Sequence, residues 1–141
     1  LAADPRRPIR ATLHPKETYP PSEIAALDRI AARDPRFQVI AGRAEDLLAT
    51  CDAVVTQNSA VALNGFFAQK PAVLFAGSDF HHIAGSVPRE GVERAFARID
   101  APPPDYARYL TWFFRCHCVN GGDPHAEDQI LARLRRHGWP I

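Results

Sequence analysis

The chain has 141 residues, which is near the commonest size of a single domain and long enough to bury a hydrophobic core. Its 17 basic and 16 acidic residues leave a net charge of +1, so the composition gives no support for nucleic-acid binding. No apolar run approaches the roughly 20 residues of a membrane-spanning helix, no signal-peptide pattern opens the chain, and 3 cysteines are too few for a disulfide framework. We therefore expect a cytoplasmic protein without a transmembrane segment. Because the chain begins with Leu1 and contains no Met, we also expect a fragment of a longer protein.

Strand and helix patterns alternate over the first part of the chain. Residues 9–13 alternate apolar and polar side chains, and His14-Pro15 ends this strand because proline cannot continue the ladder. Ser22 is a suitable N-cap for an amphipathic helix. The elements predicted here are a strand over residues 9–13, a helix over 22–33, a strand over 37–40 and a helix over 44–51.

The centre of the chain predicts one βαβ unit. A β-branched strand over residues 52–56 leads into the polar turn Gln57-Asn58-Ser59, then into an apolar helical segment over 60–67 and a second strand from Lys70 to Gly77. The polar turn would lie at the carboxyl end of the first strand and the amino end of the helix, where backbone N–H groups and the helix dipole favour anions. Asn and Ser are also preferred N-caps when no ligand is present.

After this unit the pattern becomes less regular. Residues 77–91 read as a long polar loop, which is often functional in a compact domain. The elements predicted beyond it are a helix over residues 92–99, a proline linker over 102–104, an aromatic-rich helix from Asp105 to about residue 119 and a last amphipathic helix over 125–136.

Strands alternating with helices predict the α/β class, with a Rossmann-like parallel sheet covered by helices on both faces. We expect a Rossmann-like domain over residues 1–100, which the resemblance described below makes a nucleotide-sugar-binding domain, and a C-terminal helical segment over 101–141 that packs on it. Ligands of such sheets bind beyond the carboxyl ends of the strands. His14, Asn58 and Ser59 would all lie at that edge, where imidazole, hydroxyl and backbone N–H groups can hold a phosphate. Lys16 would add positive charge nearby.

Several short motifs resemble the C-terminal, nucleotide-binding half of the capsule polysaccharide biosynthesis glycosyltransferases, the bacterial family that includes the Kdo transferases of capsule export lipids. The matching segments cover most of residues 9–135 and are Leu13-His14-Pro15-Lys16-Glu17, Asp46-Leu47-Leu48, Cys51 to Ser59, Lys70-Pro71-Ala72-Val73 and Tyr109 to Phe113 with Asn120.

The resemblance implies one half of a GT-B fold and a donor that is a cytidine-monophosphate-activated acidic sugar such as CMP-Kdo. It makes His14, the expected catalytic group, and Ser59 the phosphate-binding residues, with Asn58 alongside. It also implies a transfer that needs no metal and no cofactor, since imidazolium, hydroxyl and helix dipole would stabilise charge on the departing phosphate. The resemblance also implies a cytoplasmic location, either free in the cytoplasm or bound peripherally to the inner membrane.

Two departures from the family pattern stand out. At the position five residues after the serine, where a glutamate is expected to contact the ribose, this chain has Asn64. The family fold also has two domains with the active site between them, and this chain supplies one. We therefore expect the isolated chain to be inactive and to need an N-terminal acceptor domain or a partner chain.

Other readings compete with this one. Cys116-His117-Cys118 with His81, His82 and His125 could suggest zinc, but two cysteines two positions apart on a helix point to different faces, so we expect no metal site. Asp79 and His81 could form an acid/base pair. The alternative is that they belong to a solvated polar loop without a role in chemistry. The aromatic stripe over residues 106–114 fits a core or an interface with a missing domain better than a stacking platform. The alternative function is a non-catalytic GT-B-like domain with a binding or structural role, and an epimerase of the same fold is a third reading.

Overall fold

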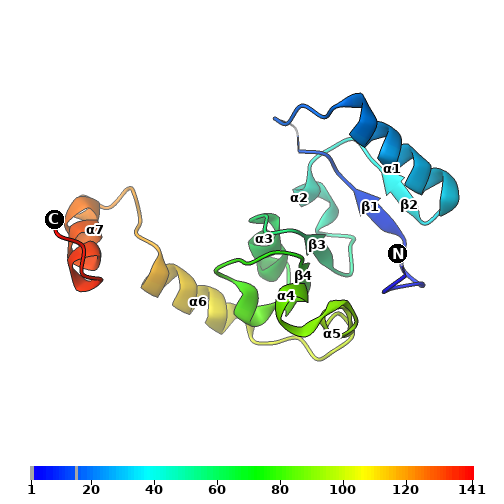
Figure 1. Cartoon of the computed structure of the whole chain (residues 1–141). Helices are drawn as coiled ribbons and strands as arrows, with labels where there is room; N and C mark the ends of the chain where they lie inside the picture. The colour runs from blue at the N-terminus through cyan, green and yellow to red at the C-terminus, as the bar shows by residue number, and fades with distance from the viewer. Residues whose placement is uncertain (1, 15) are drawn as a thin grey trace. The chain divides into compact units, whose positions relative to one another are not determined.

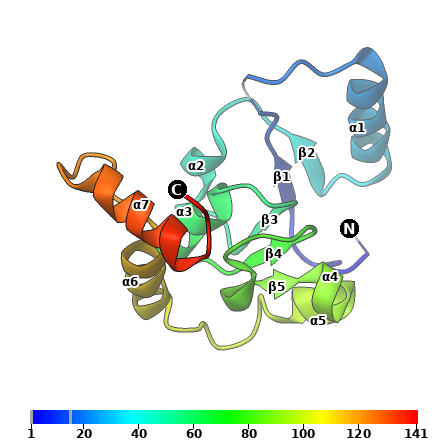
Figure 2. The same cartoon turned by 60° about the vertical axis from the view of Figure 1, so that its left-hand side comes forward.

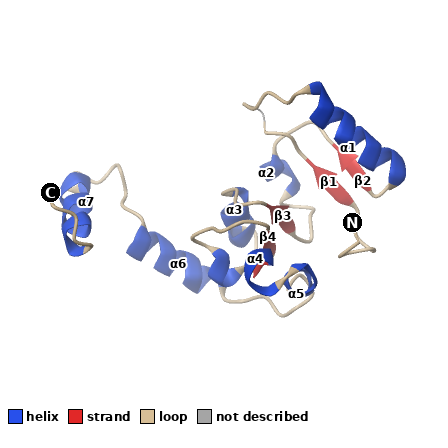
Figure 3. Cartoon of the chain, in the orientation of Figure 1, coloured by secondary structure: helices blue, strands red, loops and turns tan. Residues whose placement is uncertain are grey.

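The computed structural model describes residues 2–14 and 16–141. They divide into two compact units, one ending at Pro104 and one beginning at Asp105. Strands and helices alternate along the first unit, and the second contains helices (Figures 1 and 3). Over the described ranges, no helix has the length and apolar character needed to cross a membrane.

The first unit begins with a βαβ segment. Strand β1 (Ile9–Ala11) pairs in parallel with β2 (Phe37–Val39), with Ile9 opposite Phe37, and α1 (Pro21–Arg33) connects them. The predicted N-cap at Ser22 is wrong, because the helix begins at Pro21 and Pro20 occupies the cap position. Proline suits the first helical position because the N–H that it lacks would have no helical partner there. A short helix, α2 (Ala44–Leu47), follows.

The predicted central βαβ unit is present. Strand β3 (Val54–Thr56), helix α3 (Val61–Phe67) and strand β4 (Ala72–Leu74) follow in order, and β3 pairs in parallel with β4. Figure 2 shows β5 (Gly85–Ser86) on the other side of β4, again in parallel, which gives the order β3-β4-β5.

The observed architecture is therefore mixed α/β with parallel strands, as predicted. In the described part of the chain the strands form two sheets, β1-β2 and β3-β4-β5, whereas we expected one. The prediction of a polar loop over residues 77–91 is wrong, because this segment contains η1 (His81–Ile83), β5 and α4 (Val87–Glu90). Ala84 and Ser86 are buried, since β5 lies beside the central strand of its sheet. Helix α5 (Val92–Ala97) follows.

The hydrophobic core of this unit surrounds the three-stranded sheet. Phe66, Val73 and Leu74 are its largest fully buried side chains. Two glycines allow helices to approach the strands closely. A Cβ at Gly65 in α3 would lie 2.9 Å from Cγ2 of Val54. A Cβ at Gly85 in β5 would clash with the backbone of Ala95 in α5. No residue described between 2 and 51 reaches the same degree of burial.

The second unit contains α6 (Tyr106–His117) and α7 (Ala126–Arg136). The Asp105 carboxylate caps α6 by accepting a hydrogen bond of 2.9 Å from the backbone N–H of Arg108. Aromatic rings follow one another along α6 at helical spacing, and the centroids of Tyr109 and Phe113 lie 5.9 Å apart. Trp112 is still 45% exposed, so the aromatic stripe is only partly a core.

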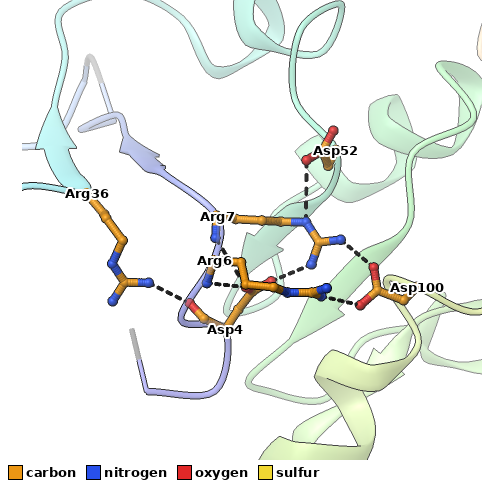
Figure 4. Close-up of polar contacts among 6 residues, drawn as sticks. All are labelled: Asp4, Arg6, Arg7, Arg36, Asp52 and Asp100. Atoms are coloured by element: carbon orange, nitrogen blue, oxygen red, sulfur yellow. Dashed lines mark hydrogen bonds and ion pairs between the residues drawn. The ribbon is translucent and has the colours of Figure 1, made fainter.

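A cluster of charged side chains joins segments of the first unit that are distant in sequence (Figure 4). The Arg7 guanidinium forms ion pairs with Asp4 and Asp100, and its Nε lies 3.4 Å from Oδ2 of Asp52. Arg6 adds a contact of 2.7 Å to Asp100. Asp4 and Arg7 precede β1, Asp52 precedes β3, and Asp100 follows α5. The cluster therefore lies at the amino ends of β1 and β3, away from the strand ends where ligands of such sheets bind.

A third arginine, Arg36, extends this cluster toward β2. Its NH1 group donates a hydrogen bond of 2.8 Å to the backbone carbonyl of Asp4, and its Nε donates one of 3.0 Å to Asp34. These bonds have electrostatic consequences. The hydrogen bond from Arg7 lowers the pKa values of Asp4 and Asp100, and the hydrogen bond from Arg36 lowers that of Asp34.

We predict that Gly85→Ala destabilises the chain by roughly 1 to 3 kcal/mol, the usual cost of forcing an extra carbon into a packed core. Gly77→Ala is the matched control, because a Cβ there meets no atom within 4 Å, and it should change stability by less than about 0.5 kcal/mol. Both tryptophans, Trp112 and Trp139, belong to the second unit, so urea unfolding should be followed by far-ultraviolet circular dichroism. Equal stability of the two variants would contradict the close approach of β5 and α5.

The Arg7 cluster predicts an acid-dependent loss of stability. The pKa values of Asp4 and Asp100 are lowered below 3.8, so their contribution is complete above that value and is lost as pH falls through the folded-state pKa. Arg7→Gln should therefore destabilise the chain near neutral pH, and the difference from wild type should shrink between about pH 5 and pH 2. Arg43→Gln, which removes an exposed pair with Glu45 of 3.5 Å, is the control and should show little difference at either pH. If the difference in the free energy of unfolding between wild type and Arg7→Gln stays constant across this pH range, the stabilising role of the Asp4 and Asp100 carboxylates is refuted.

Candidate functional site

The turn between β3 and α3 holds two of the predicted site residues. Helix α3 begins at Val61, so Ala60 is the N-cap and Ser59 lies one position before it. The Ser59 hydroxyl accepts a hydrogen bond of 3.3 Å from the N–H of Val61, and the N–H of Ser59 donates one of 3.4 Å to the Thr56 hydroxyl. Both Asn58 and Ser59 are exposed, so a ligand can reach them from solvent.

Internal bonds use most backbone donors of this helix start. The N–H of Ala62 bonds to the Ser59 carbonyl at 3.1 Å, and those of Leu63 and Asn64 bond to the Ala60 carbonyl at 2.9 and 3.3 Å. With only 7 residues, α3 also has a small macrodipole. An anion at this turn would therefore depend on the Ser59 hydroxyl and the Asn58 amide more than on the helix itself. In the described ranges the Asn58 side chain has no hydrogen-bond partner.

Asn64 lies on α3, one helical turn beyond Ala60. Its side chain is exposed and, within residues 2–14 and 16–141, makes no hydrogen bond. Its backbone carbonyl accepts from the N–H of Ala68 at 3.2 Å, which is ordinary helical bonding. Asn64 thus presents a neutral amide to solvent on the same βα unit as Asn58 and Ser59.

His14 follows β1, as predicted, and is exposed. Its backbone N–H donates a hydrogen bond of 2.8 Å to the Tyr19 hydroxyl, and its Nδ1 accepts one of 3.3 Å from the backbone N–H of Lys16. Because Nδ1 is the acceptor, the proton of the neutral ring belongs on Nε2, which is then a donor. Pro15, the other residue of the predicted motif, lies outside the described residues.

The structure thus forms two groups of predicted site residues. His14 and Lys16 belong to the segment after β1 and are joined by a hydrogen bond. Asn58, Ser59 and Asn64 belong to the β3-α3 segment of the other sheet. Among the described residues, no hydrogen bond or ion pair joins the two groups directly, so a ligand that touches both would have to bridge them.

The loop after β4 runs beside the β3-α3 turn. The N–H of Phe75 donates to the Thr56 carbonyl, and the N–H of Ala76 donates to the Gln57 carbonyl, both at 2.9 Å. These bonds continue the pairing of β3 and β4 beyond the ends of the strands. Residues that follow Ala76 therefore belong to the same edge of the sheet as Asn58 and Ser59.

Two adjacent histidines lie in this loop. Nδ1 of His81 is hydrogen-bonded to the backbone carbonyl of Ser78, and the rings of His81 and His82 have centroids 3.8 Å apart. The only signal for this arrangement in the sequence is a histidine doublet soon after a strand. For the alternative acid/base pair of Asp79 and His81, the structure shows one relevant bond, which joins Nδ1 of His81 to the backbone carbonyl of Ser78.

Other possible sites receive less support. In the part of the chain that the structure describes, no group of three or more His, Cys, Asp or Glu residues is placed to hold a metal ion. Burial raises the pKa of the Cys51 thiol, which makes it a poor nucleophile. A shallow hollow on α6 is lined by none of the predicted site residues but by Asp105, Arg108, Tyr109 and Trp112.

In comparisons with known proteins, no family model matches the chain, and neither a curated protein nor a solved structure matches it significantly.

Proposed function

We propose that this chain is the donor-nucleotide-binding part of a bacterial capsule or surface polysaccharide glycosyltransferase, with a cytidine-monophosphate-activated acidic sugar such as CMP-Kdo as donor. The observation that carries the proposal is the parallel β3-α3-β4 unit with exposed Asn58 and Ser59 at its carboxyl edge. Parallel α/β sheets bind ligands at this edge, and both side chains can donate to phosphate oxygens. The motif resemblance assigns the same residues to the phosphate of the donor.

His14 supports the proposal through its hydrogen bonding. The backbone N–H of Lys16 donates to Nδ1, so the neutral ring carries an Nε2–H donor, and His14 is exposed. A donor of this kind can bond to a phosphate oxygen, and a protonated ring would add a charge-assisted bond. His14 and Ser59 would then stabilise the negative charge that develops on the departing cytidine monophosphate. The side chain of Lys16, also exposed, would add positive charge at the same place.

Transfer would also require an acceptor site and a base. We propose that an N-terminal domain of the same protein or a partner chain supplies them, since the family fold places its active site between two domains. Orientation of donor against acceptor accounts for a large part of the rate of such reactions. The chain by itself would therefore bind the donor without transferring the sugar.

The second candidate function is that of a non-catalytic GT-B-like domain with a binding or structural role. Asn64 favours it, because an amide accepts a ribose hydroxyl less strongly than the expected carboxylate would. The separation of His14 from Ser59 on two sheets also favours it. A domain that has lost donor binding would show no preference among nucleotides.

The first test is calorimetric titration of the full chain with cytidine monophosphate and with uridine diphosphate. We expect cytidine monophosphate to bind more tightly, and His14→Ala to weaken it by about 1 to 3 kcal/mol, roughly 5- to 150-fold, because a bond to phosphate is lost. His137→Ala, which replaces another exposed histidine, is the control and should bind like wild type. Unchanged affinity in a folded His14→Ala variant would remove His14 from the site.

The second test restores the missing carboxylate. Asn64→Glu should tighten binding of cytidine monophosphate by roughly 1 kcal/mol, about fivefold, because an ionised acceptor forms stronger hydrogen bonds with ribose hydroxyls. The 2′,3′-dideoxy analogue lacks those hydroxyls and should gain nothing. If Asn64→Glu leaves the affinities for cytidine monophosphate and its dideoxy analogue equally low, the hypothesis of a non-catalytic domain is the better one.

A further inference from the structure

The loop after β4 contains a hydrogen-bond acceptor that the protein itself leaves unused. Nδ1 of His81 donates its proton to the Ser78 carbonyl, so the neutral ring has a bare lone pair on Nε2. Nε2 is buried and, among the described residues, has no hydrogen-bond partner. Among the described residues that are buried or half-buried, it is the one side-chain nitrogen or oxygen in this condition. Buried polar atoms without partners are rare in folded proteins, so this one calls for an explanation.

The position of His81 is fixed by packing on both sides of the loop. Phe80, 7% exposed, packs edge-on against the fully buried Phe66 of α3, with ring centroids 6.3 Å apart. The Ser78 hydroxyl accepts a hydrogen bond of 3.3 Å from the N–H of Phe80, which closes the turn. The bond from Ala76 to Gln57 ties the start of the loop to the β3-α3 turn. His81 is thus held close to the unit that carries Asn58, Ser59 and Asn64.

The ring of His82 contributes to the cover over His81. Its centroid lies 3.8 Å from that of His81, and His82 is itself exposed. Exposed side chains change rotamer within picoseconds to nanoseconds, so this ring can move aside without a change in the backbone. The acceptor is therefore ordered in advance by the bond of His81 to Ser78, and binding at Nε2 requires that the groups covering this atom move aside.

The chemistry of Nε2 limits what can bind it. A bare lone pair repels phosphate and carboxylate oxygens, and the described residues include no set of three ligands that would hold a metal ion with it. It suits the proton of a hydroxyl group. Resting on the proposed donor site, we propose that His81 Nε2 accepts a hydrogen bond from a hydroxyl of the bound donor, either on the ribose or on the acidic sugar. His81 would thereby help to select a polyhydroxylated ligand beside the phosphate-binding residues.

Two substitutions at His81 separate the acceptor from the rest of the side chain. In His81→Asn the amide can still donate to the Ser78 carbonyl but has no atom at the position of Nε2, whereas the longer side chain of His81→Gln can place an acceptor there. We expect His81→Asn to weaken binding of the cytidine-activated sugar donor about five- to tenfold, as for loss of one neutral hydrogen bond, and His81→Gln to restore most of it. His137→Asn, the same change at an exposed histidine of the second unit, is the control and should bind like wild type.

The 2′,3′-dideoxy analogue and the sugar-bearing donor identify the hydroxyl. If His81→Asn weakens cytidine monophosphate but not the dideoxy analogue, the ribose supplies it. If only the cytidine-activated sugar is weakened, the sugar supplies it. If His81→Asn weakens binding of cytidine monophosphate and of the dideoxy analogue equally, the hydrogen-bond donor lies on the base and the proposal is overturned. Unchanged affinity of His81→Asn for cytidine monophosphate, its dideoxy analogue and the sugar donor would overturn it as well.

The wild-type protein separates this inference from the proposed function. If wild type binds none of the three ligands, the proposed function fails together with this inference. If wild type binds them and His81→Asn binds them equally well, this inference alone fails.

Discussion

The Arg7 guanidinium, with a further contact from Arg6 to Asp100, forms a polar connection between the two parallel sheets of the first unit. No described ladder hydrogen bond joins the sheets, but Arg7 precedes β1 and reaches both Asp52, before β3, and Asp100, after α5. A planar guanidinium can bond several carboxylates at fixed angles, which a lysine cannot do. The Arg7 and Asp4 side chains are only 25% and 12% exposed, so solvent and salt screen this pair less than a typical surface pair, whereas Asp52 and Asp100 are mostly exposed. The Arg7 cluster joins the amino ends of β1 and β3. The segments that follow the carboxyl ends of these strands can share a ligand only if this connection holds the two strands together.

Within the three-stranded sheet, helices and strands are held together by close contact between their backbones. Gly65 lets α3 lie directly on β3, and Gly85 lets α5 lie directly on β5. Phe66 then meets Phe80, so the same packing that forms the core also fixes the loop that bears His81. Asn58 and Ser59 therefore lie in an exposed turn between two well-packed elements, β3 and α3. Such an arrangement holds side chains in place before a ligand arrives, which reduces the ordering required on binding.

The sequence was most informative where periodicity was strong. The β-branched run before Gln57, the helical spacing after it and the proline before Ala72 led to the correct βαβ unit. It was least informative where structure depends on distant contacts. Strand β5 has only 2 residues, and the small residues there are buried by α5, which no local pattern announces. The contacts of Arg7 with Asp52 and Asp100, and the bond that orients His81, likewise depend on residues brought together by the fold. The positions of Asn58, Ser59 and His14 at turns after strands were predictable, but their division between two sheets was not.

The uneven distribution of buried side chains means that the first unit has parts of different local stability. The described core residues of that unit begin at Val54 and end at Ala95, whereas β1, α1 and β2 have no fully buried side chain. Segments with few buried apolar contacts open at lower free energy than the rest of a domain. The segment that bears His14 thus belongs to the less stable part, and Ser59 to the more stable part. A ligand that bridges them would shift the opening equilibrium of β1 and β2 toward the closed state, so that donor concentration would control how ordered this half of the unit is.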